Sequence, residues 1–319
     1  MPRLHGARPS EESARRPERR GGEMIPEPVI DAHHHIWRHA ATPWLNGPAQ
    51  PRIFGEYAPL RRDYLAADFK ADVQPCGVVK SVYIQVNVEP GAEVEETRWV
   101  ASQAAEHGFP HAVVGYADLA APDVADTLDR EAQACNLRGI RQQLHWHENP
   151  TWRFAPRPDV MMSAQWRRGL REVARRGLVF DLQVFASQMA DAASLARDFP
   201  EVTFVLLHAG MLESRSAEGV ERWRMGLKAL AACPNVLVKL SGLGTFDHAC
   251  SLALWEPVVR QTLDAFGPGR CLYGSNYPIE SLWTSYATLF STMNACLSGL
   301  SPAERRAVLH DNAARVYGL

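Results

Sequence analysis

The sequence predicts an α/β protein built as a single-domain (β/α)8 barrel, also called a TIM barrel. Three observations lead to this prediction. Eight short runs of apolar and β-branched residues alternate with longer segments of helical pattern, and strands that alternate with helices form parallel sheets. No block of strands without intervening helices interrupts this alternation. The length of 319 residues also suits such a barrel, which takes roughly 250 residues or more.

The predicted strands are the short apolar runs, and the predicted helices are the segments between them. The strands are expected at Val29–His35, Val78–Val86, Ala112–Leu119, Leu137–Leu144, Leu178–Val184, Thr203–Ala209, Asn235–Gly242 and Arg270–Ser275. The clearest helices are expected at Glu93–Glu106, Val124–Ala134, Ala164–Arg176, Ser187–Asp198, Val220–Ala232 and Leu254–Phe266. Eight strands favour a closed barrel over an open doubly wound sheet. Neither GxGxxG nor GxxxxGKS/T is present, so nothing marks a nucleotide-binding open sheet.

The two ends of the chain differ in character. Ser301-Pro302-Ala303-Glu304 resembles a capping box with proline at the first helical position, and it opens a final helix that ends near Tyr317. Residues 1–26 are rich in Arg, Glu, Pro and Gly and lack the apolar stretch of a secretory signal. We expect a disordered N-terminal extension there, which leaves residues 27–319 for the barrel.

The composition excludes several classes of protein. A hydrophobic content of 46% is enough for a large core, and a net charge of −2 gives no reason to expect nucleic acid or an anionic membrane as a partner. No apolar run approaches the roughly 20 residues of a membrane helix. The six cysteines form no CxxC pair, which indicates free thiols in a reducing compartment and predicts a cytoplasmic protein. The expected partner is a small-molecule substrate, and homo-oligomerisation is left open.

Two connections between predicted elements are long. One runs from Trp37 to about Leu65 and is rich in Pro, Trp and Arg, and the other runs from His145 to about Met162. Both follow strands, so in a barrel they lie at the C-terminal rim, where active sites are found. Long loops of this kind are usually lids or binding loops.

Three consecutive histidines end the first predicted strand, in Asp31-Ala32-His33-His34-His35. Because side chains alternate across a strand, Asp31, His33 and His35 are expected on one face and His34 on the other. Two imidazoles pointing inward at a barrel mouth offer two metal ligands or two hydrogen-bond donors. The alternative is a histidine-rich strand end with only core or surface roles.

Two further strand ends carry polar residues. His208 follows the apolar run Leu206-Leu207 at the end of the sixth strand, where a buried strand meets the rim. Taken alone, such a histidine is as often a core residue as a functional one. Asn276 follows Gly274 and Ser275 at the end of the eighth strand, which lies next to the first strand in a closed barrel. The alternative for Asn276 is an ordinary turn residue.

His33-x-His35, His208 and the GSNYP segment around Asn276 together resemble the amidohydrolase superfamily. The closer resemblance is to its lactonase-like branch, the amidohydrolase 2 type, a group of TIM-barrel hydrolases predicted to depend on metal. That branch includes lactonases for sugar acids and for pyrone dicarboxylate. The resemblance implies catalytic roles for His33, His35, His208 and Asn276, with the three histidines as metal ligands.

The chain departs from the family pattern at Asn276, where the family has an aspartate that takes a proton from the attacking water. An amide cannot act as a general base near neutral pH. No lysine stands on the fourth strand to bridge two metals, and the fifth strand offers Gln183 where other branches have His or Glu. These departures argue against a two-metal centre.

Two mechanisms remain open at this stage. In the first, His33, His35 and His208 bind one divalent ion, with zinc preferred because three neutral imidazoles suit it. In the second, no metal is bound and the histidines donate hydrogen bonds to the substrate carbonyl. The base is then a metal hydroxide, His145 or Asp31.

Substrate-binding residues are expected around the rim. Arg141, Gln143 and His145 alternate along the fourth strand and share a face. The other candidates are Trp37 and Trp44 of the first long loop, Gln183 of the fifth strand, Lys239 and Ser241 of the seventh strand, and Arg153 and Arg157 of the second long loop. The alternative is that the tryptophans only pack and that the two loop arginines are solvated charges. Several cations around one mouth favour an anionic or polyhydroxylated substrate.

Three functions follow from these features. The leading one is a hydrolase that opens a lactone or a related ester. A decarboxylase of an unsaturated or aromatic acid is the second, because protonating a carbanion needs no hydrolytic water. A barrel that binds a ligand without turnover is the third, and the loss of the usual aspartate at Asn276 favours it.

Overall fold

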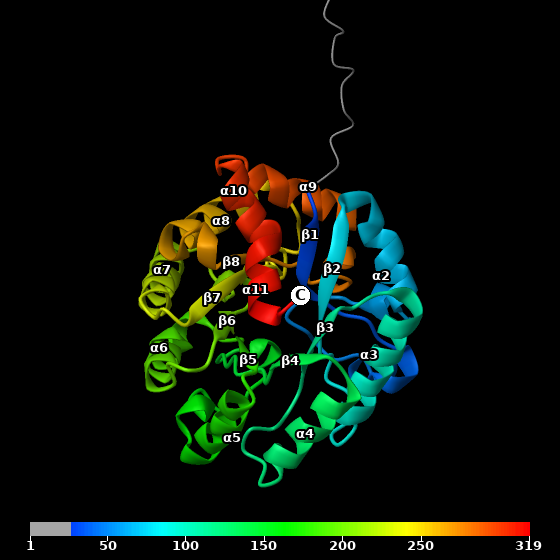
Figure 1. Cartoon of the computed structure of the whole chain (residues 1–319). Coiled ribbons are helices and arrows are strands. Elements are labelled where there is room, and N and C mark those ends of the chain that lie inside the picture. The colour runs from blue at the N-terminus through cyan, green and yellow to red at the C-terminus, as the bar shows by residue number, and fades with distance from the viewer. Residues whose placement is uncertain (1–26) are drawn as a thin grey trace, which may run out of the picture.

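The computed structural model describes residues 27–319, so the expected disorder of residues 1–26 lies outside the described part of the chain. Eight parallel strands follow one another around a barrel in the order β1 to β8 (Figure 1). Their bounds are β1 Val29–His34, β2 Val78–Ile84, β3 Ala112–Gly115, β4 Leu137–Ile140, β5 Val179–Leu182, β6 Phe204–Leu206, β7 Val236–Leu240 and β8 Cys271–Tyr273. The predicted (β/α)8 barrel is therefore confirmed.

The barrel closes between β1 and the segment that follows β8. His34 and Tyr277 form a parallel bridge, and the amide of His35 donates to the carbonyl of Tyr277 at 2.8 Å. The amide of Asn276 donates to the carbonyl of His33 at 2.7 Å. These bonds fix the end of β8 beside the three consecutive histidines.

Helices surround the barrel and bury their apolar faces against the outer side of the strands (Figure 1). Their bounds are α1 Pro43–Asn46, α2 Ala66–Val73, α3 Glu93–His107, α4 Val124–Ala134, α5 Ala164–Arg175, α6 Met189–Asp198, α7 Ala217–Ala231, α8 Leu252–Phe266, α9 Tyr286–Cys296, α10 Pro302–Arg306 and α11 Asn312–Tyr317. Large side chains such as Trp166, Trp223 and Trp255 fill this outer layer. The sequence analysis missed α1, α2 and α9 and placed the other boundaries within a few residues.

The inner core of the barrel is separate from the outer layer and is closed at its lower end by the C-terminus. Small and β-branched residues from the strands pack there with Ala313 and Tyr317 of α11. Figure 1 shows α11 lying across this end of the barrel. The predicted capping box is confirmed, since the Ser301 hydroxyl accepts from the Glu304 amide and the Glu304 side chain accepts from the Ser301 amide.

The regular strands are shorter than the sequence predicts, and the difference falls at the mouth. β4 ends at Ile140 and β6 at Leu206, so Arg141 and His208 lie just beyond the hydrogen-bonded ladder. Among the helices of residues 27–319, we find none with the length and apolarity to cross a bilayer.

Candidate active site

The imidazoles of His33, His35 and His208 meet at the mouth of the barrel. The His33 ring lies 5.1 Å from the His35 ring and 4.7 Å from the His208 ring, measured between centroids. His33 and His35 come from the end of β1, and His208 comes from the end of β6 on the other side of the barrel. His33 and His208, which are 175 positions apart in the chain, are thus brought into contact.

Asp31 does not share the face of His33 and His35, contrary to the expectation from simple alternation. The pairing of β1 with β2 shifts register between Asp31 and His34. As a result the Asp31 carboxylate lies in the outer layer, where it accepts a hydrogen bond from the Tyr286 hydroxyl of α9 at 2.9 Å. A β-bulge is invisible in a sequence pattern, and this one removes Asp31 from the candidates for the catalytic base.

The rings of His35 and His208 are each held by a partner at Nδ1. The His35 Nδ1 lies 2.7 Å from the carbonyl oxygen of Ile84, and the His208 Nδ1 lies 3.0 Å from the Ser241 hydroxyl. A carbonyl oxygen can only accept, so the His35 Nδ1 carries a proton. In a neutral ring the lone pair is then on Nε2, which is the arrangement of a metal-binding or proton-accepting histidine.

The segment that presents His208 has an unusual backbone. His208 and Ala209 have φ angles of 55° and 48°, a left-handed conformation that costs an L residue roughly 1–2 kcal/mol. Gly242 makes room for the ring, since a Cβ there would lie 2.5 Å from the His208 Nδ1. Backbone strain of this kind is concentrated at functional sites.

The three imidazoles are neutral at physiological pH. Burial lowers the pKa of His33 well below its usual value, and the neighbouring His208 and Lys239 lower it further. Burial and the Arg141 charge act in the same direction on the pKa of His208 and bring that of His35 to about 3. Neutral imidazoles are the form that ligates metals.

The donor set fits a single divalent ion in its chemistry. Both ring nitrogens of His33 are buried without a hydrogen-bond partner, an expensive state unless something else binds them. The Nε2 atoms of His35 and His208 are not used by the partners named above. Within residues 27–319, however, no three His, Cys, Asp or Glu side chains are already arranged around one ion position. The site therefore offers suitable ligands without a preformed cage.

Asn276 lies between the histidine cluster and a buried carboxyl group that the sequence analysis did not identify. Its side chain contacts the His35 ring on one side and Glu280 on the other. The Glu280 carboxyl is fully buried and accepts from the Trp283 indole at 2.7 Å. Burial raises the pKa of Glu280 to about 8, so the group behind Asn276 is protonated near neutral pH.

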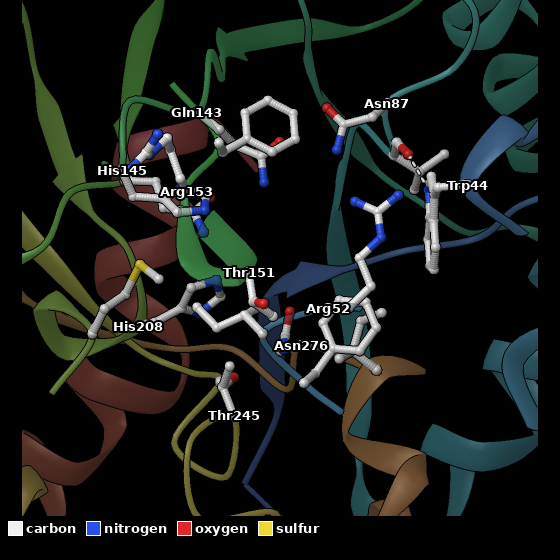
Figure 2. A pocket seen from close by; sticks show the side chains of 18 of the residues that line it. Trp44, Arg52, Asn87, Gln143, His145, Thr151, Arg153, His208, Thr245 and Asn276 are labelled. Carbon is white, nitrogen blue, oxygen red and sulfur yellow. Dashed lines mark hydrogen bonds between the residues drawn. The ribbon is translucent and has the colours of Figure 1, made fainter. Parts of the chain in front are cut away.

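A cavity of about 190 Å³ opens above the histidine cluster (Figure 2). His35, His208 and Asn276 form part of its wall, while His33 lies beneath it and is not exposed to it. Most of the predicted substrate-binding residues line this cavity: Trp37, Trp44, Arg141, Gln143, His145, Arg153 and Gln183. Their roles in binding stay predictions, but the structure brings them all to one place.

Three other rim candidates lie elsewhere. Lys239 points into the centre of the barrel below the site and forms a fully buried ion pair with Asp181, with 2.6 Å between Nζ and Oδ2. Ser241 is occupied with the His208 ring. Arg157 pairs with Asp159 and does not line the cavity. The sequence analysis placed Lys239 too close to the mouth, because its pairing with Asp181 of β5 depends on contacts across the barrel that a strand pattern does not reveal.

Several cavity residues were not singled out by the sequence analysis. They are chiefly Arg52 and Phe54 of the first long loop, Asn87 after β2, and Thr245 and Phe246 after β7. The Trp and Arg content of the first long loop is a signal for binding residues there. The loops after β2 and β7 gave no sequence signal, since their short polar stretches look like ordinary turns.

This arrangement, with histidines on β1 and β6 at the C-terminal mouth of a (β/α)8 barrel, is that of a barrel hydrolase. The chain belongs to the amidohydrolase family, whose model matches residues 30–319. It is therefore an enzyme of the hydrolase type that acts on a small-molecule substrate, as the sequence predicts. The family expectation drawn from His33, His35, His208 and Asn276 is confirmed.

Two relatives and one solved structure are similar to this chain over nearly its whole length. "Uncharacterized protein y4mH" of Sinorhizobium fredii is 40% identical over 91% of this chain and 98% of its own length. An L-fucono-1,5-lactonase of Burkholderia multivorans is 33% identical over 91% of this chain and 96% of its own length. A crystal structure of a Burkholderia multivorans amidohydrolase with bound zinc superposes with a TM-score of 0.77, at 31% identity, over 91% of this chain and 99% of that one.

Proposed function

We propose that this enzyme opens a lactone of a small anionic or polyhydroxylated acid. The observation that carries the proposal is the cluster of neutral imidazoles at the floor of an arginine-containing cavity, in which His35 presents an unprotonated Nε2. Support comes from the relative named L-fucono-1,5-lactonase, which is 33% identical.

In such a reaction water adds to the lactone carbonyl, and the bond between this carbon and the ring oxygen then breaks. The ring oxygen leaves as the hydroxyl group of an open-chain hydroxy acid, which releases a proton at neutral pH. Because its Nδ1 is bonded to Ile84, His35 cannot donate a hydrogen bond to the carbonyl through Nε2. Its Nε2 lone pair is available to a metal ion instead, which leaves His145, in the cavity wall with an unpartnered Nδ1, as the group to accept the proton that Asn276 cannot take.

We propose that His33, His35 and His208 hold one divalent ion, with zinc the first candidate. The zinc in the Burkholderia multivorans structure supports this choice, as do the unpartnered nitrogens of His33. When bound, such an ion polarises a carbonyl and lowers the pKa of a water ligand. The protein's own contribution is to keep the three rings neutral and to fix two of them through Ile84 and Ser241.

The function is tested with a panel of sugar-acid and carboxylated lactones, followed by proton release at constant pH. We expect turnover of at least one lactone and a loss of about 1,000-fold in kcat/KM in His208→Asn, since deleting one group that acts on the transition state costs about this much. Asparagine tolerates the left-handed backbone at this position. His107→Asn, at the C-terminal end of α3 and outside the cavity lining, is the matched control and should keep full activity.

Two outcomes would contradict the proposal. One is carbon dioxide release from an unsaturated or aromatic acid with no lactone opened, which would identify a decarboxylase. The other is full activity in His208→Asn. For the metal, elemental analysis should find about one equivalent of zinc or manganese per chain, lost in His208→Asn, and the thermal midpoint should fall when a chelator removes it. A metal-free protein with full activity would overturn the metal assignment.

A further inference from the structure

The charges that line the cavity are all of one sign. Arg52, Arg141 and Arg153 line it, and no aspartate or glutamate does. The chain as a whole carries a net charge of −2, so this concentration of positive charge is local and does not reflect a basic protein. A cavity with several guanidinium groups and no carboxylate attracts an anionic ligand.

The three arginines differ in how far the protein already uses them. Arg141 donates to the Gln85 carbonyl at 2.5 Å and to the Gln183 side chain at 3.4 Å. Arg153 donates through Nε and Nη2 to the carbonyls of His147 and Glu148, each at 2.9 Å. Both therefore hold neighbouring segments in place.

Arg52 has no such bonds. Among the described residues its guanidinium makes neither a hydrogen bond nor an ion pair, and its Nε is buried without a partner. A buried cationic donor without an acceptor is costly unless a ligand supplies one. Arg52 is thus the arginine of this cavity whose donors are available for a substrate.

The guanidinium of Arg52 is nevertheless held in position. It lies 5.6 Å from the centre of the Trp44 ring, and Trp44 is itself fixed by a hydrogen bond from its indole to the Val86 carbonyl at 2.8 Å. Figure 2 shows the Arg52 guanidinium beside the Trp44 ring, turned toward the cavity. A guanidinium that packs on an aromatic face keeps its in-plane donors free, and these match the two oxygens of a carboxylate.

The loop that carries Arg52 is supported from outside as well. Phe54 packs against Trp44 with 5.9 Å between ring centres, and Gly55 lies directly against the His248 ring, which stacks on Trp283. These contacts place Arg52 over the cavity without any bond to the guanidinium itself. The loop after β1 therefore presents a positioned and unused cation.

We infer that Arg52 binds a carboxylate of the substrate that is remote from the reacting carbonyl, and so makes this enzyme selective for lactones with a second acidic group over neutral ones. The inference rests on the proposed lactone hydrolysis and names the substrate class for it. Arg141, deeper in the cavity and already bonded, helps to position the reacting end.

The inference is tested with a matched pair of substrates. D-glucaro-1,4-lactone differs from D-glucono-1,4-lactone in that its terminal hydroxymethyl group is a carboxylate. We expect the wild-type enzyme to favour the glucaro compound in kcat/KM, with the difference mainly in KM. In Arg52→Gln the ratio of the two kcat/KM values should fall by at least about tenfold, since hydrogen bonds to charged groups are strong. Arg52→Lys should restore part of it.

Arg157→Gln is the matched control, because this arginine belongs to the other long loop, pairs with Asp159 and does not line the cavity. It should leave the substrate ratio unchanged. Binding of the non-reacting acids D-glucarate and D-gluconate, measured by calorimetry, gives a readout that does not need turnover. Wild type should bind glucarate more tightly, and Arg52→Gln should lose that preference.

The outcomes separate this inference from the proposed function. If both lactones are opened with equal kcat/KM and Arg52→Gln lowers both equally, lactone hydrolysis stands and the role of Arg52 is wrong. If no lactone is opened, the proposed function is wrong, and the glucarate preference in calorimetry decides whether Arg52 binds carboxylates. Equal binding of both acids would overturn the inference. Tighter binding of glucose 6-phosphate than of glucarate would replace carboxylate by phosphate and overturn it too.

Discussion

The two ends of the barrel treat buried polar groups in opposite ways. Toward the lower end, in the barrel interior below the site, Lys239 pairs with Asp181, and the Tyr317 hydroxyl of α11 donates to the other Asp181 oxygen at 2.8 Å. At the mouth, both nitrogens of His33 and the Nε of Arg52 have no partner in the described structure. Folding alone favours buried polar groups that have hydrogen-bond partners. The difference therefore indicates that the lower end is built for stability and that the mouth is built to receive a ligand.

The sharpest test of this contrast is Lys239→Met. The substitution leaves the Asp181 carboxylate buried without its cation, which costs about 3–5 kcal/mol of unfolding free energy. Urea titration monitored by tryptophan fluorescence measures the loss. The double variant Asp181→Leu/Lys239→Met should recover most of it, because replacing both members of a buried pair is often neutral. A loss below about 1 kcal/mol in Lys239→Met would break the comparison.

Tyr317→Phe should have the next largest effect. It removes the hydroxyl that donates to Asp181 while it keeps the ring that packs beneath Lys239 at 5.0 Å. We expect a loss of about 1.5–3 kcal/mol, the usual value of a hydrogen bond to a charged group. Tyr57→Phe, whose hydroxyl accepts from the Gln50 amide in the first long loop, is the control and should cost less. Equal losses of unfolding free energy in the two variants would mean that the lower end contributes no more to stability than the loop does.

Glu280→Gln tests a buried carboxyl group just behind the mouth, through the pH dependence of the unfolding free energy. The pKa of Glu280 is raised to about 8 by burial, and the groups around it are Trp283, Asn276 and the Gly244 backbone. The folded state keeps the proton while the unfolded chain releases it, so wild-type stability should fall as pH rises from 5 to 8. In Glu280→Gln this decline should be smaller by on the order of 1–2 kcal/mol.

Urea titrations at pH 5, 6.5 and 8 measure the decline, with the exposed Glu201→Gln as the reference. Parallel pH profiles for wild type and Glu280→Gln would show that Glu280 is ionised in the folded protein at neutral pH. That result would contradict the account of its pKa.

The smallest effect is expected at the mouth, from Gln143→Leu. The Gln143 Oε1 is buried without a partner, so its removal should change the unfolding free energy by less than about 0.5 kcal/mol, or stabilise the protein. Activity should fall, because a polar group of the cavity wall is lost. If Gln143→Leu destabilised as strongly as Lys239→Met, the mouth would not differ from the lower end.

Much of the fold could be predicted from the sequence because its signal is periodic. Each strand and most helices were located from apolar runs, and the Ser301 capping box marks the start of α10. The boundaries were less accurate at the mouth, where Arg141 and His208 leave the ladder. Helix α9 was missed because Tyr286–Cys296 has little amphipathic contrast, with apolar side chains on several faces.

Part of the candidate site could be predicted as well. His33, His35 and His208 were recognised because histidines at strand ends are uncommon and because strand ends share one rim. Arg52 was not assigned, since nothing local distinguishes a free arginine in a loop from a solvated one. Glu280 gave no signal either, because its burial depends on Trp283 and Gly244 packing around it.

The sequence by itself determined the alternation of strands and helices, and with it the barrel and the rim on which the histidines stand. Only the tertiary structure decided that a register shift turns Asp31 outward, that Lys239 is neutralised by Asp181, and that Arg52 is left without a partner. The physical reason is that periodicity is a property of neighbouring residues. Whether a charge is paired depends on groups that are distant in the chain and meet only when the barrel closes.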